Sequence, residues 1–408
     1  MSRQGPLQAI AFCAFALTCM LNLQAQQIES YPTSVGYQLL DTDYAPEYTI
    51  EEYTVAPGAI RAGASQDSVI AASCGDSCDA GCETGCEAPC ETSCEVSCNS
   101  CQRIVCCCPP WYRHRTGAFG ELLYLAPASS DLIYAVEQTD PTATANPTGP
   151  LGRSNIDPHV GFRVGLAQAL SDCSSLVVSY ARWDGDTNSS ITASPGTVLN
   201  SQLIHPSTAT TGAASISATA DQTINFQTVD AILRRVFKST GCGVLNWNGG
   251  LRYGNLEQGL SADQTVAVAT GLTNVTTDVD FNGWGIIFGL DGERKAQNSG
   301  LLVYGKVFGS LLAGNWQANY AQVNQFGGGI IANSYRDFRI TPVVDTELGV
   351  GWLSKEGHLK LTTGYSFSTW FNSVNNRDYI QSVRTGNQLE LHESVSFTGL
   401  TSRIEIRL

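Results

Sequence analysis

The sequence predicts an all-β protein: a transmembrane antiparallel β-barrel of about ten to twelve strands, preceded by a disordered, Cys-rich N-terminal arm. Two observations predict the barrel, namely strict two-residue alternation in the last segment and connections of alternating length between amphipathic runs. A third, an acidic segment without periodicity, predicts the arm. We therefore expect a signal peptide over residues 1–25, an acidic, Cys-rich, low-complexity arm over 26–110 and an outer-membrane barrel over 111–408.

The first segment has the pattern of a secretory signal peptide. Arg3 precedes an apolar run over residues 7–23, and Ala25 offers a small residue for cleavage. No later segment reaches the roughly 20 consecutive apolar residues that a membrane-spanning helix needs. Export to an oxidising compartment would permit disulfide bonds.

The arm carries most of the negative charge. The formal net charge of the chain is −14 at pH 7, and residues 26–110 hold thirteen Asp and Glu residues against only Arg61 and Arg103. The rest of the chain is close to balance. An acidic arm followed by a nearly neutral body excludes nucleic-acid binding, which needs a basic surface.

Eleven cysteines lie within 35 residues of the arm, and the first seven recur every fourth residue. Zinc sites commonly use C-x2-C pairs with histidines or a second pair at a distance, whereas this tract has three-residue spacers and no histidine. Cross-linking by disulfides, within one chain or to a second copy or another envelope partner, is the leading interpretation. Soft-metal binding and inert low-complexity sequence are the alternatives. The candidates are Cys74, Cys78, Cys82, Cys86, Cys90, Cys94, Cys98, Cys101, Cys106, Cys107 and Cys108.

The last nine residues alternate between apolar and polar side chains. A two-residue period places alternate side chains on opposite faces of a strand. One face then presents Leu400, Ile404, Ile406 and Leu408, and the other presents Arg403, Glu405 and Arg407. Membrane lipid on one side and a polar lumen on the other explain both faces. The alternative is an amphipathic strand in a soluble sandwich.

Ten amphipathic runs with this period follow one another in the barrel region. The connections alternate between four short turns and five long segments of roughly 20–35 residues, which is typical of outer-membrane barrels with tight turns in the periplasm. The arm would then be periplasmic as well. The expected strands are 119–126, 158–170, 174–186, 222–238, 243–257, 279–293, 300–316, 336–353, 358–371 and 396–408.

The polar faces of these strands predict the lining of a lumen for small solutes, while the apolar faces contact outer-membrane lipid. The charges on the predicted lining are of mixed sign, with small Gly and Ser residues between them. The predicted pore-lining residues are Arg163, Arg252, Asp291, Lys306, Asp345, Glu347, Lys360, Arg403, Glu405 and Arg407.

The tryptophans provide a second expectation, because Trp prefers the bilayer interface. Trp183, Trp284, Trp316 and Trp370 fall near the outer ends of the expected strands, and Trp247 and Trp352 fall near the inner ends. We expect them to mark the two interfaces. Ordinary core tryptophans are the alternative.

No motif in the sequence indicates catalysis, a metal site or a cofactor. The five histidines are isolated, neither a G-x-S-x-G nucleophile motif nor a phosphate-binding glycine loop is present, and we expect no catalytic residue. A barrel enzyme with a site at the outer rim is the weakest of three functional hypotheses. The histidines are His114, His159, His205, His358 and His392.

Several glycine-rich strand motifs resemble a known family in their order and spacing. They are Phe119–Leu125, Val160–Leu166, Asn248–Tyr253, Gly283–Asp291, Gly309–Leu312 and Gly364–Phe371. This region, residues 119–408, resembles the Legionella major outer-membrane protein-like, pore-forming family. The resemblance implies an outer-membrane barrel of the porin type that passes small polar solutes or ions. A structural envelope protein, whose barrel anchors the cross-linking arm, is the alternative.

Overall fold

The computed structural model describes residues 111–128, 130–140, 145–208, 215–266, 272–296, 299–325, 330–388 and 391–408. The predicted signal peptide, the arm and its eleven cysteines lie outside the described residues. The elements are β1 (Gly117–Ala128), β2 (Leu132–Gln138), β3 (Pro147–Ser154), β4 (His159–Ser171), β5 (Ser174–Thr192), β6 (Val198–Ser201), η1 (Pro206–Thr208), β7 (Ser215–Ser239), β8 (Gly243–Val266), β9 (Leu272–Lys295), β10 (Leu301–Asn324), β11 (Ile330–Leu353), β12 (Leu359–Ser373), α3 (Asn376–Thr385) and β13 (Glu393–Arg407).

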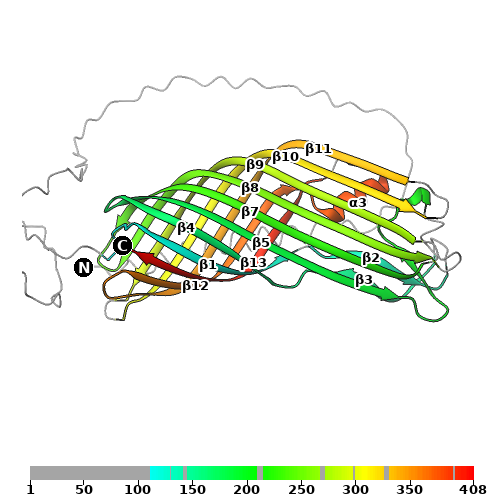
Figure 1. Cartoon of the computed structure of the whole chain (residues 1–408), viewed down its shortest axis with the longest axis horizontal. Helices are drawn as coiled ribbons and strands as arrows, with labels where there is room; N and C mark the ends of the chain where they lie inside the picture. Colours follow the sequence, from blue (N-terminus) through cyan, green and yellow to red (C-terminus); the bar gives the residue numbers. More distant parts are fainter. Residues whose placement is uncertain are drawn as a thin grey trace, which may run out of the picture. The chain divides into compact units, whose positions relative to one another are not determined.

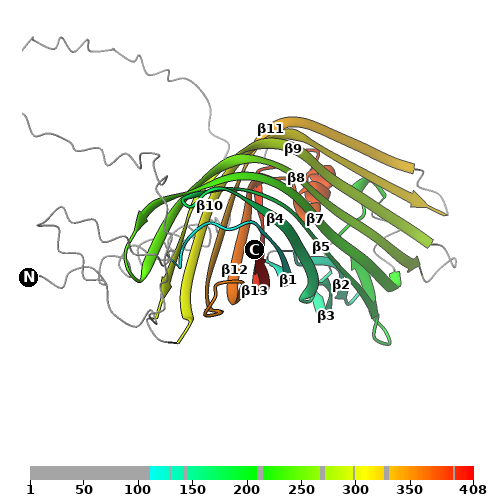
Figure 2. The same cartoon turned by 60° about the vertical axis from the view of Figure 1, so that its left-hand side comes forward.

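Ten of the described strands close into an antiparallel barrel. Their order around the ring is β1-β4-β5-β7-β8-β9-β10-β11-β12-β13, and β1 pairs with β13 from Gly117↔Arg407 to Ala128↔Ser396. Figures 1 and 2 show these strands curving around a common axis. The all-β barrel predicted from the sequence is confirmed, and its ring has the lower of the predicted strand numbers.

The two ends of the barrel differ in their connections. At one end, called here the short-turn end, residues 172–173, 240–242, 296–300 and 354–358 join consecutive strands. The opposite end, the long-loop end, carries β2, β3, β6, η1 and α3. β2 pairs with β3 and β6, and β6 meets β7 at Leu199↔Ser215, so these short strands extend the sheet beyond the ring.

Two of the five predicted long connections are wrong. β8 continues to Val266 and β9 begins at Leu272, while β10 continues to Asn324 and β11 begins at Ile330. These segments are hairpin arms whose outward positions are polar, such as Asp263, which accepts a 2.8 Å hydrogen bond from Asn274 of the paired strand. A strand that projects into water needs no apolar outer face, so the amphipathic pattern does not reveal it.

The outer surface divides into an apolar part and a polar part. Strands β7 to β11 have 24 or 25 residues each, about twice the 9–11 residues that cross a bilayer. Exposed large apolar side chains gather on the half toward the short-turn end, and we call this surface the outer apolar band. On β9, for example, Trp284, Ile286 and Phe288 are 64%, 54% and 56% exposed, whereas Asp278 lies further toward the long-loop end.

Helix α3 packs inside the wall near the long-loop end. Asn375 caps its N-terminus by accepting a hydrogen bond from the Asp378 amide, and Gly386 ends it in the left-handed conformation at φ 69°. The Tyr379 hydroxyl donates toward the carbonyl oxygens of Ala318 and Asn333, both at 3.1 Å. Among the described residues, no helix is long and apolar enough to cross a membrane.

The prediction that the tryptophans mark the bilayer interfaces is wrong for three of them. Trp183, Trp316 and Trp370 are at most 2% exposed and belong to an apolar core inside the barrel. They occupy inward positions of their strands, where burial of a large ring is favourable. By contrast, Trp284 and Trp352 lie on the outer surface, as does Trp247.

The boundary of the barrel domain remains a prediction that a fragment can test. Every strand of the ring begins at or after Gly117. A fragment of residues 111–408, refolded in detergent, should therefore give the heat-modifiable band shift of a folded β-barrel on gels. The full chain refolded in parallel is the control. A band shift for the full chain but none for the fragment would place the boundary further upstream.

Candidate functional site in the barrel interior

The barrel interior toward the short-turn end is lined by charged side chains. Nine of the ten predicted pore-lining residues stand beside an exposed apolar residue in their strands, as Arg252 does beside Leu251, and Asp345 stands beside the half-buried Val344. The structure brings them together with four charged residues that the sequence reasoning missed. We call these residues the ion-pair layer; the missed members are Glu121, Asp230, Arg234 and Glu293.

Arg252 makes the most extensive contacts in the ion-pair layer. Its Nε and Nη2 donate to the two carboxylate oxygens of Asp230 at 2.7 and 2.9 Å, and its Nη1 donates to Asp345 Oδ2 at 2.5 Å. Asp230 is on the neighbouring strand β7, whereas Asp345 is on β11, which is not adjacent to β8 in the ring. The guanidinium therefore spans the interior. Such a pair is specific in geometry because the Arg fork matches a carboxylate.

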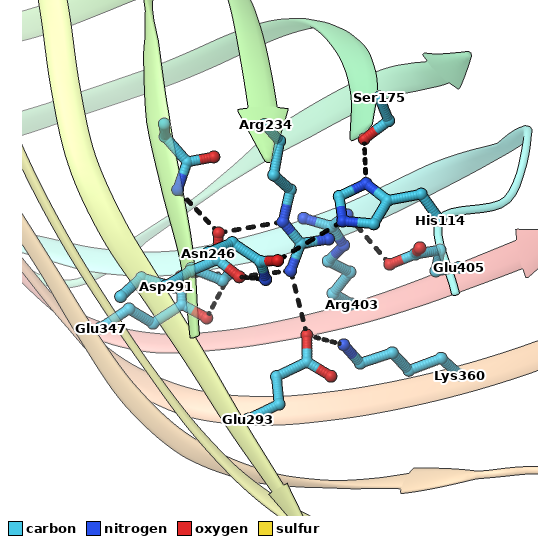
Figure 3. A network of polar contacts seen from close by, with 12 residues as sticks. His114, Ser175, Arg234, Asn246, Asp291, Glu293, Glu347, Lys360, Arg403 and Glu405 are labelled. Carbon is cyan, nitrogen blue, oxygen red and sulfur yellow. Dashed lines mark hydrogen bonds and ion pairs between the residues drawn. The ribbon is translucent and has the colours of Figure 1, made fainter. Parts of the chain in front are cut away.

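A second group of contacts joins β7, β8, β9 and β12 (Figure 3). Arg234 forms a bidentate ion pair with Asp291, which also accepts hydrogen bonds from Asn246 and Asn248 at 2.9 and 2.7 Å. Lys360 Nζ lies 2.5 Å from Glu293 Oε1, and these two residues come from strands that are not neighbours. Asp291 is thus fully engaged in holding the wall together.

A third group completes the ion-pair layer. Lys306 Nζ lies 3.1 Å from both carboxylate oxygens of Glu347, which also accepts a 2.5 Å hydrogen bond from the Tyr304 hydroxyl. Arg163 pairs with Glu121 at 2.8 Å. Glu405 pairs with Arg403 at 3.0 Å and with Arg407 at 2.8 Å. Since burying an unpaired charge costs several kcal/mol, this pairing makes a charged interior tolerable.

An internal cavity of about 170 Å³ lies within the ion-pair layer. Six basic and six acidic side chains line it, so the charges of the lining cancel. A polar cavity of this volume has room for several ordered water molecules. The interior at this level is therefore a hydratable compartment without a net charge.

Aromatic side chains fill the interior beyond this cavity. Phe397 packs against Phe226 and Trp183 with ring centroids 4.8 and 5.3 Å apart, and Phe281 packs against Trp316 at 4.9 Å. We call this the aromatic layer, and its members are Trp183, Phe226, Phe281, Trp316, Trp370 and Phe397. Together with α3, it closes the interior between the cavity and the long-loop end. An apolar layer of this kind opposes the passage of hydrated ions.

The residues just before β1 cross the opposite opening. Residues 111–116, called here the strap, contact three separate parts of the short-turn end. The Trp111 indole packs against the buried cluster of Leu302, Tyr304 and Leu353 and donates to the Gly241 carbonyl at 3.1 Å. Arg113 Nε lies 2.6 Å from Asp172 Oδ1. The His114 amide also donates to the Asp172 carbonyl at 3.0 Å. The strap therefore covers the opening rather than lying beside it.

His114 extends from the strap into the interior. Its Nδ1 lies 2.7 Å from Ser175 Oγ and its Nε2 lies 3.4 Å from Asn246 Oδ1. Burial, and next the positive charge of Arg234, lower the pKa of His114 from 6.5 to about 4. The ring is therefore neutral near pH 7. Both His114 and Ser175 are buried, so their contact holds the strap and is not an accessible catalytic pair.

The residues missed by the sequence reasoning share a recognisable signal. Asp230 and Arg234 occupy even-numbered positions of β7, and their side chains lie on the other face of this strand from the exposed Val229, Leu233 and Phe237. The same parity applied to every strand selects inward residues. It does not select His114, because the strap precedes the first strand. Two further cysteines, Cys173 and Cys242, lie in the turns that the strap contacts, and neither forms a disulfide within the described part of the chain.

Comparison with protein families identifies one match over most of the chain. The family model described as the Legionella pneumophila major outer membrane protein precursor matches residues 114–406. The match covers the strands of the barrel and confirms the resemblance seen in their motifs. No curated protein sequence matches the chain significantly.

Solved structures with a similar fold are outer-membrane barrels of very different sequence. The outer membrane protease OmpT from Escherichia coli is 9% identical in sequence and has a TM-score of 0.43. The match covers 72% of this chain and 97% of the OmpT chain. The Pseudomonas putida toluene transporter TodX is 10% identical in sequence and has a TM-score of 0.27, and the match covers 72% of this chain and 90% of the TodX chain. At these identities and scores, neither likeness bears on activity or ligand.

Removal of Arg252 tests the ion-pair layer. Arg252→Met should lower the free energy of unfolding by about 3 kcal/mol, because it leaves Asp230 and Asp345 without their shared cation. Guanidinium-induced unfolding in detergent micelles, followed by tryptophan fluorescence, measures the change. Arg182→Met is the control: Arg182 pairs with Asp184 on the exposed surface, so its loss should cost under about 1 kcal/mol.

A triple variant distinguishes lost pairing from lost packing. Arg252→Met combined with Asp230→Asn and Asp345→Asn removes the unpaired charges and should recover most of the lost stability. Equal instability of the single and triple variants would show that the packing of the Arg252 side chain, rather than its ion pairs, stabilises the barrel.

Proposed function

The chain belongs to the family of the Legionella pneumophila major outer membrane protein precursor, and from that premise we propose that this bacterial outer-membrane barrel is a channel for small polar solutes or ions. The observation that carries the proposal is the ion-pair layer with its cavity of about 170 Å³, at the level of the outer apolar band. A barrel that served only as an anchor could fill this level with apolar side chains at lower desolvation cost.

The asymmetry of the barrel supports an orientation. Outer-membrane barrels have short turns in the periplasm and longer loops outside. We assign the short-turn end to the periplasm and the long-loop end to the exterior. The strap, and the arm that precedes it in the sequence, would then be periplasmic.

The described conformation is a closed state of the proposed channel. Small barrels have interiors that side chains fill, whereas open aqueous channels are typical of about sixteen strands. The aromatic layer closes the outer half and the strap covers the periplasmic opening. Passage of a solute would require movement of both. The balanced charges around the cavity favour weak discrimination between cations and anions.

Single-channel conductance in planar bilayers tests the channel proposal. We expect low or rare conductance from the full chain and a several-fold increase for Trp370→Ala, because Trp370 lies inside the barrel next to Gly254 and Leu312 and is 2% exposed. Trp284→Ala is the matched control, since this ring is 64% exposed on the outer surface and should leave conductance unchanged.

A second variant keeps the test decisive should Trp370→Ala destabilise the barrel. Replacing residues 374–391, which include α3, by a short Gly-Ser turn should also raise conductance. Folding of each variant is checked by heat modifiability. Folded protein that never conducts, in any of these forms, would contradict the channel proposal.

The alternative function, an envelope anchor, is favoured by one specific observation. The strap contacts Gly241 and Asp172, which are adjacent to Cys242 and Cys173, and eleven cysteines precede the strap in the sequence. A closely spaced set of thiols in an oxidising compartment tends to form disulfides. The odd number of arm cysteines leaves at least one for another chain or for a turn cysteine. The barrel would then fix a covalent network to the outer membrane.

Gel analysis under non-reducing conditions tests the anchor function. Cells lysed with a thiol-blocking reagent should yield the protein as high-mass species that collapse to a monomer on reduction. The fragment of residues 111–408, expressed in the same cells, is the control and should remain monomeric. A monomer of the full chain in which all eleven arm cysteines can be alkylated would contradict cross-linking and favour the soft-metal interpretation.

A further inference from the structure

A hollow of about 1130 Å³ lies on the lipid-facing surface near the short-turn end. Strands β9 to β13 and β1 contribute to it, and these strands can be followed in Figure 2. We propose that this hollow binds one anionic glycerophospholipid, with its phosphate against Arg294 and an acyl chain along the apolar floor. The assignment rests on the orientation proposed above, which places this end in the phospholipid leaflet on the periplasmic side.

The floor of the hollow is apolar and outward-facing. Leu122, Leu301, Val303, Val350 and Ile404 are each between 52% and 57% exposed, so their side chains point away from the interior. The volume exceeds the roughly 300–1,000 Å³ of typical small-molecule pockets. A recess of this size within a membrane is filled by lipid, and acyl chains match its apolar surface.

The rim of the hollow carries one cation, Arg294, whose side chain has no ion pair within the described part of the chain. Arg294 is exposed and continues the outward alternation of Phe288 and Leu290. Lys295 pairs across the sheet with the buried Leu302 and therefore lies on the inward face. The neighbouring acid, Glu293, is committed to Arg234 and Lys360 in the interior. The cross-strand partners of Arg294 are Gly243 and Val303, which are uncharged. The planar fork of an Arg side chain can bind phosphate oxygens through two hydrogen bonds.

Charge complementarity favours a lipid over a second copy of this chain. Contact between two copies through the hollow would bring their Arg294 side chains toward each other, and like charges repel. A phospholipid supplies the opposite charge at the rim and apolar chains at the floor. Each Lys or Arg near an anionic membrane surface adds about 1 kcal/mol of attraction.

Native mass spectrometry of the full chain in dodecyl maltoside micelles containing palmitoyl-oleoyl-phosphatidylglycerol measures the binding. We expect one retained lipid per chain. Arg294→Gln should weaken retention about fivefold. Arg235→Gln, which removes an exposed cation on β7 outside the hollow, should leave retention unchanged. Heat modifiability verifies that each variant is folded.

A filling variant tests the hollow independently of its charges. Gly120 lines the hollow, and a Cβ added there has no atom within 4 Å, so Gly120→Phe can occupy the space without disturbing the sheet. It should reduce retention as strongly as the charge variant. Unchanged retention would overturn the proposal, because the lipid would lie elsewhere.

Three further outcomes would also overturn the proposal. Equal loss in the Arg235 control would indicate diffuse attraction to the surface. Equal retention of phosphatidylcholine, which carries no net charge, would show that Arg294 does not select the headgroup. Displacement of the lipid by glycerol phosphate at the same concentration would show that the site binds a soluble phosphate compound instead.

Discussion

The pairing of β1 with β13 is the contact on which the remainder of this structure depends. In lipid, every backbone amide and carbonyl must find a partner within the protein, so a sheet can cross the membrane only when its two edges meet. The register from Gly117↔Arg407 to Ala128↔Ser396 provides that closure. Once the ring is closed, the two-residue period assigns each side chain either to lipid or to the interior.

Closure then determines what the interior must contain. Ten strands leave a narrow space that side chains can fill, and this barrel fills it in two ways. Toward the short-turn end, Arg252, Asp230 and Asp345 and the other pairs of the ion-pair layer neutralise one another across the space. Toward the long-loop end, rings such as Trp316 and Phe281 exclude water. The polar level coincides with the outer apolar band, so the charges lie in the membrane-spanning region, where their pairing matters most.

The aromatic layer and the strap block the interior at opposite ends, and they have different consequences for the proposed functions. The aromatic layer belongs to the barrel wall and to α3, so its movement is a property of the barrel alone. The strap is continuous with the arm, and its contacts with Gly241 and Asp172 place it beside two cysteine-bearing turns. The proposed channel and anchor functions are therefore compatible in one molecule, because a force or a bond acting on the arm would act directly on the opening at the short-turn end.

The sequence by itself determined the ten ring strands and the face on which each side chain lies. Alternation of apolar and polar residues is local, so Arg252 beside Leu251 could be assigned an interior position without knowing its neighbours. The same local signal failed where the outward face is polar, as in the extensions of β8 to β11, and where the inward residue is apolar, as with Trp183, Trp316 and Trp370.

Only the tertiary structure decided which charges pair and whether the interior is open. Lys360 and Glu293, or Arg252 and Asp345, meet because of the ring order and the register, which depend on every strand at once. The position of α3 inside the wall and of the strap across the opening depends on contacts between segments far apart in the sequence. Periodicity contains no information about such contacts, because it describes the environment of a residue and not the identity of its neighbours.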